Sequence, residues 1–157
     1  DAWRAELPAK TQATLARHEA TGQHDHPDYK AALGILYDRH FCRVKPMPEP
    51  LATAIAHMGG PVYGHMWGAN EFTCTGTLHS WDRTDRLGEI RVPTLITVGE
   101  FDEVRPSCAE TMHRGIARSQ LKVFEGCGHA VHCEAPVAFR AAVRRFLAEV
   151  APVGAAA

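Results

Sequence analysis

Hydrophobic and polar residues follow different patterns in the two halves of the chain. In the first half, apolar residues recur at helical spacing between breaks rich in proline and glycine. Helices are predicted over residues 8–21, from 27 to the prolines at 46–50, and over 49–58 and 62–69. Strand-like alternation is missing from this half, so residues 1–84 are predicted to form a helical region.

The second half alternates between strand and helix patterns. Residues 92–99 form a nearly continuous apolar run of strand length, followed by a predicted helix over 106–118 and a short strand over 121–124. A last helix over 136–150 places one apolar face toward a sheet. Residues 85–157 therefore read as α/β. Two strands with one crossover helix leave a sheet uncovered, so we expect a further polypeptide segment to complete it.

Two titratable residues follow the two predicted strands. Asp102 lies in the loop after the first strand, and His129 lies in the loop after the second. Because the carboxyl ends of neighbouring parallel strands meet at one sheet edge, we expect a carboxylate–imidazole pair. In the alternative, Asp102 caps the helix that starts at Pro106. His132 is a second histidine candidate, which we expect to pack near the site rather than act in it.

Composition restricts the class of partner and the compartment. The 157 residues are 45% hydrophobic and 22% charged, with a formal net charge of -1, which is unfavourable for binding nucleic acid or an anionic membrane. No apolar run reaches the roughly 20 residues of a membrane helix. Five cysteines without a Cys-x-x-Cys motif favour a reducing compartment, and we expect a cytoplasmic protein.

Several motifs resemble a known family. The sequence Pro-Thr-Leu-Ile-Thr-Val-Gly-Glu-Phe-Asp at 93–102 and Gly-Cys-Gly-His at 126–129 resemble the C-terminal third of an α/β-hydrolase. Trp-Gly-Ala-Asn-Glu-Phe-Thr at 67–73 and Trp-Asp-Arg-Thr at 81–84 narrow the resemblance to the proline iminopeptidase (prolyl aminopeptidase) family. The resemblance implies the C-terminal part of an α/β-hydrolase core over 85–157 and a helical lid (cap) domain over 1–84.

The family implies a role for each candidate site residue. His129 would act as the general base of a serine exopeptidase, and Asp102 would orient it. Glu71 and Glu103 would bind the protonated amino terminus of a small peptide or amino-acid amide, and Phe72 would line a slot for the proline ring. In the alternative, Glu71 is a solvated surface charge and Phe72 is part of the lid core.

The chain lacks the family's nucleophile. No Gly-x-Ser-x-Gly or His-Gly-Gly sequence occurs in it, so the serine is expected on the N-terminal part of the same hydrolase, in a missing segment or a second chain. The implied mechanism requires no cofactor. A metal at His129 and His132, or at residues 24–26, is not expected, because further ligands at suitable spacing cannot be identified. Cys127 is expected to be a packed thiol.

Two other functions stay open at this point. The chain could come from another lidded α/β-hydrolase, such as an esterase, lactonase or amidase, because the fold hosts many activities. Two acids near the site favour a cationic substrate over the neutral substrates of most of these enzymes. The chain could also be a non-catalytic fragment, in which case an intact acid–histidine pair would have no use.

Overall fold

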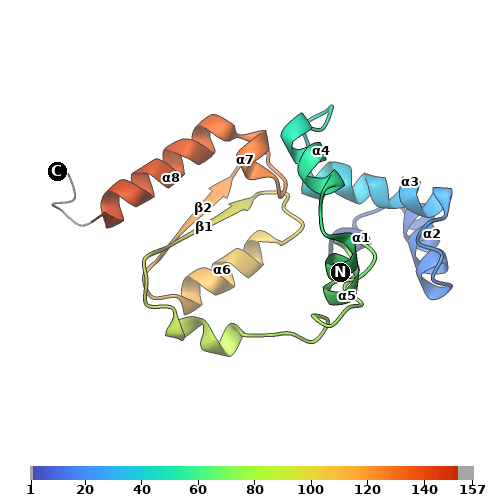
Figure 1. Cartoon of the computed structure of the whole chain (residues 1–157), viewed down its shortest axis with the longest axis horizontal. Helices are drawn as coiled ribbons and strands as arrows, with labels where there is room; N and C mark the ends of the chain where they lie inside the picture. The colour runs from blue at the N-terminus through green and yellow to red at the C-terminus, as the bar shows by residue number, and fades with distance from the viewer. Residues whose placement is uncertain (1, 152–157) are drawn as a thin grey trace. The chain divides into compact units, whose positions relative to one another are not determined.

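The chain folds into two compact units, Asp1–Trp81 (unit 1) and Asp82–Ala157 (unit 2) (Figure 1). The computed structural model describes residues 2–151. Unit 1 is helical, and unit 2 contains a parallel pair of strands with helices (Figure 1).

In the described part of unit 1 there are six helical elements. These are α1 (Ala2–Ala5), α2 (Ala9–Ala20), α3 (Pro27–Leu36), the π-helix η1 (Tyr37–Phe41), α4 (Glu49–Ala56) and α5 (Gly60–Met66). The predicted helices are confirmed, with prolines in the first turns of α3, α4 and α5. After α2, Gly22 adopts a φ of 67°, a left-handed conformation that stops the helix at the predicted residue. The four residues of α1 are too few to produce a periodic pattern, so this helix was not predicted.

The core of unit 1 lies between α2 and α3. Leu15 on α2 and Leu36 on α3 are fully buried, and Tyr29 is 1% exposed. Leu7 and Ala32 complete the buried cluster, and Phe72 packs against it from the loop after α5. This packing is the structural role that the sequence left open for Phe72.

Unit 2 is built on two parallel strands. Strand β1 (Thr94–Gly99) pairs with β2 (Ser119–Phe124), with Thr94 opposite Ser119, and α6 (Pro106–Gly115) connects them. The remaining elements are the 3₁₀ helix η2 (Thr84–Glu89), α7 (Val131–Glu134) and α8 (Pro136–Val150). Both predicted strands and both predicted helices are confirmed. Helix α6 ends three residues earlier than predicted, because the backbone becomes extended at Ile116.

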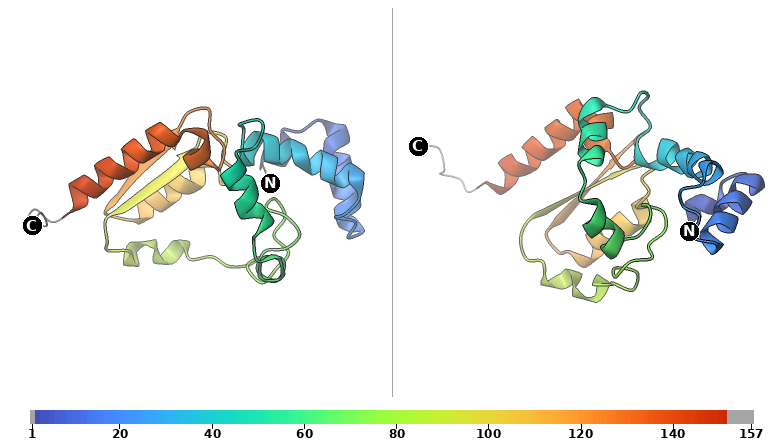
Figure 2. Two further views of the ribbon diagram at one scale, coloured as in Figure 1. Left: turned by 45° about the horizontal axis from the view of Figure 1, so that its top comes forward. Right: turned by 45° about the vertical axis from the view of Figure 1, so that its right-hand side comes forward.

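Helices α6 and α8 cover opposite faces of the strand pair (Figures 1 and 2). On the α6 side, Ile96 and Val98 of β1 pack with Ala109 and Ile116. On the other side, Phe124 packs with Cys127, Val131 and Ala142 in a second cluster, which Phe139 joins.

The apolar face of α8 is only partly covered within the described residues. Phe139 at its first turns is half-buried, whereas Leu147 near its end is 55% exposed. Val92, just before β1, is 65% exposed. Apolar surface therefore stays uncovered near the end of α8 and before β1.

Within residues 2–151, every helix is too short or too polar to pass through a bilayer.

Candidate functional site

Asp102 and His129 form a hydrogen-bonded pair beyond the ends of the two strands. His129 Nδ1 lies 2.8 Å from Asp102 Oδ1. Because an ionised carboxylate only accepts hydrogen bonds, Nδ1 is the donor in this pair, and Nε2 is the second ring nitrogen, on the side away from Asp102. The Asp102 side chain is 5% exposed and that of His129 is 46% exposed. The pair therefore combines a buried carboxylate with an accessible imidazole.

The backbone around Asp102 holds its carboxylate in place. Oδ2 accepts a hydrogen bond from Gly99 N at 3.3 Å, and Oδ1 accepts one from Val104 N at 2.9 Å. These bonds hold the carboxylate against its own loop, while Oδ1 also accepts the bond from the imidazole. The alternative of a helix-capping role is not what the structure shows, because α6 has no side-chain cap.

A close approach of two backbone segments brings His129 to Asp102. Phe101 N donates to Cys127 O at 2.9 Å, joining the loop after β1 to the loop after β2. A Cβ atom on Gly99 would lie 2.0 Å from Gly128 O. Only glycine fits at position 99, because any side chain would push the two loops apart.

Glu134 holds the histidine loop from the other side. The Oε1 atom of Glu134 accepts a hydrogen bond at 3.0 Å from the backbone N–H of Gly128, the residue immediately before His129.

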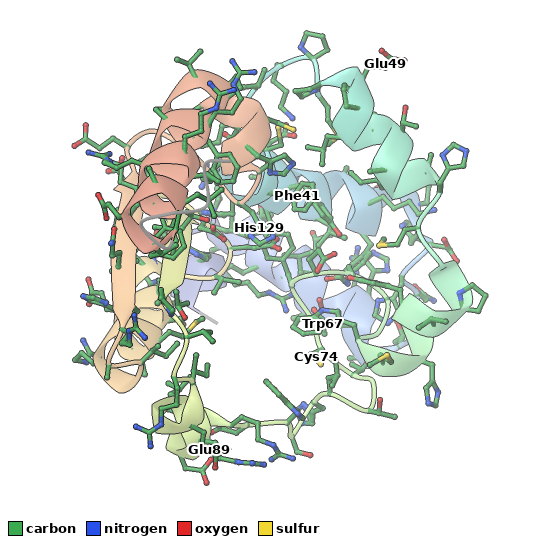
Figure 3. All side chains as sticks on the ribbon, turned by 60° about the vertical axis from the view of Figure 1, so that its left-hand side comes forward. Phe41, Glu49, Trp67, Cys74, Glu89 and His129 are labelled. Carbon is green, nitrogen blue, oxygen red and sulfur yellow. The ribbon has the colours of Figure 1, made fainter. Side chains whose placement is uncertain are left out.

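Cys127 is 5% exposed and packs in the cluster of Phe124, which is the position expected for a packed thiol. Figure 3 labels His129 on this loop. The exposed His132, three residues along, packs edge-on against Phe139 at 6.2 Å between ring centroids.

Glu103 lies beside the second nitrogen of the histidine. Its Oε1 is 4.0 Å from His129 Nε2, and its side chain is 10% exposed. A carboxylate at this distance places negative charge next to the nitrogen that would exchange protons.

Glu71 and Phe72 are the two central residues of a tight turn in unit 1. Asn70 and Thr73 are the corners of this turn and form an isolated antiparallel bridge. Asn70 Oδ1 accepts a hydrogen bond from Phe72 N at 2.9 Å, which is the Asx-turn geometry typical of asparagine. Glu71 is half-buried, and its backbone N–H lies 3.4 Å from Tyr37 Oη.

The turn sits on a loop that is closed at its base. Trp67 O accepts hydrogen bonds from Thr75 N at 2.8 Å and Gly76 N at 2.7 Å. A Cβ on Gly76 would lie 2.4 Å from the carbonyl of Met66, so this glycine allows the closure. Trp67 and Cys74 locate the loop in Figure 3.

One group of possible metal ligands occurs in the part of the chain that the structure describes. Donor atoms of His18, His26 and Asp28 lie within 4.8 Å of one another. However, Arg17 Nη2 lies 3.0 Å from His18 Nε2, and the two imidazoles are stacked 4.3 Å apart. Lone pairs lie in the ring planes, so stacked rings do not point them at a common centre. The donor set of this group does not fit a metal ion.

Curated relatives and a solved structure identify the family of the chain. No family model matches the sequence. The chain is 38% identical over 146 residues to a proline iminopeptidase of Saccharolobus solfataricus. The aligned residues cover 92% of this chain and 47% of the relative. It is similar to the crystal structure of proline iminopeptidase from Mycobacterium smegmatis, with 44% identity, a TM-score of 0.82, and coverage of 93% of this chain and 50% of that one. It also resembles the crystal structure of VinJ, with 34% identity, a TM-score of 0.90, and coverage of 95% and 51%.

The matched part is confined to one half of these relatives. The chain spans about half the length of the curated relatives that it matches. The matched part is the C-terminal half of the enzyme, as the order of strand, acid, strand and histidine predicts. The chain therefore belongs to the proline iminopeptidases of the α/β-hydrolase fold and corresponds to the C-terminal half of such an enzyme.

Proposed function

We propose that this chain supplies the acid and the base of a serine exopeptidase that releases proline, or a related amino acid, from the N-terminus of peptides or amides. The observation that carries the proposal is the 2.8 Å hydrogen bond between buried Asp102 and half-exposed His129. The similarity to proline iminopeptidases supports the choice of substrate class.

In the proposed reaction, His129 Nε2 accepts the proton of a serine hydroxyl while the serine oxygen attacks the prolyl carbonyl carbon. The imidazolium then gives this proton to the departing amine of the peptide, and an acyl-enzyme is left. A water molecule, deprotonated by the same nitrogen, hydrolyses the acyl-enzyme and frees the amino acid. Throughout, Asp102 fixes the tautomer and stabilises the imidazolium.

Substrate selection in this proposal depends on charge. A protonated secondary amine enclosed under a lid requires carboxylate partners, and we assign this role to Glu71 and Glu103. The low exposure of the Glu103 side chain and the turn that presents Glu71 support this assignment. Phe72 would border the ring of the proline. In this proposal residues 1–84 form the lid and residues 85–157 form the end of the core.

The serine and the rest of the sheet would come from the N-terminal half of the hydrolase, present as a segment or as a second chain. The hydrogen bonds of β1 support this inference. Thr94 N donates to Arg118 O, and Glu100 N donates to Phe124 O. The backbone N–H groups of the even-numbered residues of β1 therefore point toward β2. The N–H groups of Leu95 and Thr97 therefore point to the opposite edge, along which no strand lies among residues 2–151.

The two free edges of the strand pair differ in character. Strand β1 has three buried residues and no exposed one, as expected of a strand inside a sheet. In contrast, β2 exposes Gln120 and Lys122, and Lys122 lies over the Phe124 ring. Lysine on a strand discourages further pairing. We infer that the missing strands continue the sheet from β1. The odd number of cysteines, without a Cys-x-x-Cys motif, supports a reducing compartment, and we propose the cytoplasm.

The proposal is tested by producing the chain with and without the N-terminal half of a proline iminopeptidase and measuring hydrolysis of a proline arylamide. We expect activity only when the two halves are together, and intact mass spectrometry should show both in the active fraction. Failure of the two halves to associate, or an associated pair without activity toward the arylamide, would overturn the proposal.

A further inference from the structure

A polar network beneath the turn at 70–73 is not used by the chemistry described above. Its members come from three helices and from both corners of the turn. It is formed by Arg4, Glu19, Tyr29, Asn70 and Thr73.

Glu19 is the centre of this network. Arg4 Nη2 donates hydrogen bonds to both carboxylate oxygens of Glu19, each at 2.7 Å. The guanidinium thereby balances the negative charge of Glu19, whose side chain is only 19% exposed. Oε1 also accepts hydrogen bonds from Tyr29 Oη at 3.1 Å and from Thr73 Oγ1 at 3.2 Å. One carboxylate oxygen is therefore bonded directly to one corner of the turn.

Tyr29 connects the same carboxylate to the other corner. Its hydroxyl oxygen accepts a hydrogen bond from Asn70 Nδ2 at 2.8 Å, and both residues are buried. Burial and the neighbouring Glu19 carboxylate raise the pKa of Tyr29 to about 12, so the phenol keeps the proton that it donates. Asn70 thus uses its amide nitrogen to fix the turn to the helices and its amide oxygen to shape the turn.

The two residues between these corners are Glu71 and Phe72, which carry the proposed substrate contacts. A turn fixed at both corners leaves its central side chains few alternative positions. We propose that the Arg4–Glu19–Tyr29 network positions Glu71 for recognition of the substrate's amino group, through Asn70 and Thr73. This inference rests on the proposed function, because it gives the network a role in amine binding rather than in folding alone.

The network predicts a specific kinetic effect. Removing one of its hydrogen bonds should loosen the turn and weaken amine binding, so the KM for a proline arylamide should rise about three- to tenfold with little change in kcat. A substrate that keeps the ring but lacks the amine, such as the 4-nitrophenyl ester of cyclopentanecarboxylic acid, should be hydrolysed at an unchanged rate. A residue that only supports folding would affect both substrates equally.

The test compares variants in the active assembly of this chain with its N-terminal half. Thr73→Val removes the hydroxyl that bonds to Glu19, and Thr73→Ser keeps it. Thr14→Val is a matched control, because the Thr14 hydroxyl bonds to Lys10 O within α2, outside this network. Tyr29→Phe is a second variant, since it removes the bonds to both Glu19 and Asn70. Glu71→Gln reports directly on the acid.

We expect Glu71→Gln, Thr73→Val and Tyr29→Phe to raise the KM for the arylamide only, and Thr73→Ser and Thr14→Val to behave like the parent. If Glu71→Gln is selective for the arylamide but Thr73→Val and Tyr29→Phe leave both substrates unchanged or weaken both equally, the positioning role is wrong and the proposed function stands. If Glu71→Gln itself does not discriminate between the substrates, amine recognition by Glu71 is wrong, and the positioning role fails with it.

Discussion

At the scale of single residues, the Asp102 carboxylate accepts hydrogen bonds from two backbone N–H groups and from His129. Replacing Asp102 with asparagine keeps the size of the side chain but allows its amide to donate toward the imidazole. His129 would then adopt the other tautomer, with the proton on Nε2. We expect Asp102→Asn to lower kcat for a proline arylamide about 10⁴-fold in the assembled enzyme.

The control for this substitution is Asp85→Asn, at an exposed position in η2. It should leave kcat within a factor of two of the parent, an order-of-magnitude expectation for a surface substitution. Comparable rates for Asp102→Asn and Asp85→Asn would show that Asp102 does not orient the base.

Tyr29 predicts a pH dependence of stability. Its pKa is raised from 10 to about 12 in the folded chain, so between these pH values the folded state holds a proton that the unfolded state has lost. The stabilisation is complete below pH 10 and is lost as the pH rises toward 12. The free energy of unfolding should therefore fall by roughly 2–3 kcal/mol across this window.

The measurement is denaturant unfolding at pH 9.5 and at pH 11.5, for the parent and for Tyr29→Phe. Any decline common to both proteins comes from other groups. An equal decline in the two proteins would show that the Tyr29 phenol titrates normally in the folded state.

Sequence reasoning found some residues at this scale and missed others for a physical reason. Asp102 and His129 were brought together correctly, because each follows a strand and parallel strand ends meet at one edge. The network partners Glu19 and Tyr29 were missed, because their bonds to Thr73 and Asn70 join distant parts of the chain. The one local signal was the asparagine before Glu71, a residue that favours Asx turns.

At the scale of elements, the end of β1 depends on a glycine. A Cβ at position 99 would overlap Gly128 O at 2.0 Å and Cys127 O at 2.5 Å, and neither is a flexible side-chain end. We expect Gly99→Ala to destabilise the fold by about 1–3 kcal/mol and to displace the loop that carries His129, with loss of activity.

Gly88→Ala provides the matched control, because a Cβ at Gly88 in η2 meets nothing within 4 Å. Thermal unfolding and arylamide hydrolysis of the two variants give the comparison. Equal stability and activity for Gly99→Ala and Gly88→Ala would contradict the close approach of the two loops.

Elements were more predictable than their ends. Prolines at the helix starts and an apolar run with flanking Pro93 and Gly99 were sufficient to locate α3, α4, α8 and β1. The four-residue helices α1 and α7 were missed, since a single turn has no period to detect. The segment before β1, for which the sequence analysis named no element, forms the 3₁₀ helix η2.

At the scale of the whole molecule, the account requires strands beyond this chain. Thr97→Pro would remove an N–H that points away from β2, toward the edge where we expect the missing strand. Val123→Pro is the matched control, because the Val123 N–H points away from β1 at the opposite, exposed edge. We expect Thr97→Pro to lose association with the N-terminal half, measured by co-purification, and Val123→Pro to retain it. Association of both variants to the same extent would contradict an extension of the sheet from β1.

The central claim is that this chain provides the base of a serine exopeptidase, and the most direct measurement of it compares two nearby histidines. In the assembled enzyme, His129→Gln removes the nitrogen that would accept the serine proton, while His132→Gln changes an exposed ring that contacts Phe139. General-base catalysis predicts a fall in kcat of about 10²–10⁴-fold for His129→Gln, and a rate close to the parent for His132→Gln. If His129→Gln hydrolyses a proline arylamide as fast as His132→Gln, the base lies elsewhere and the account is wrong.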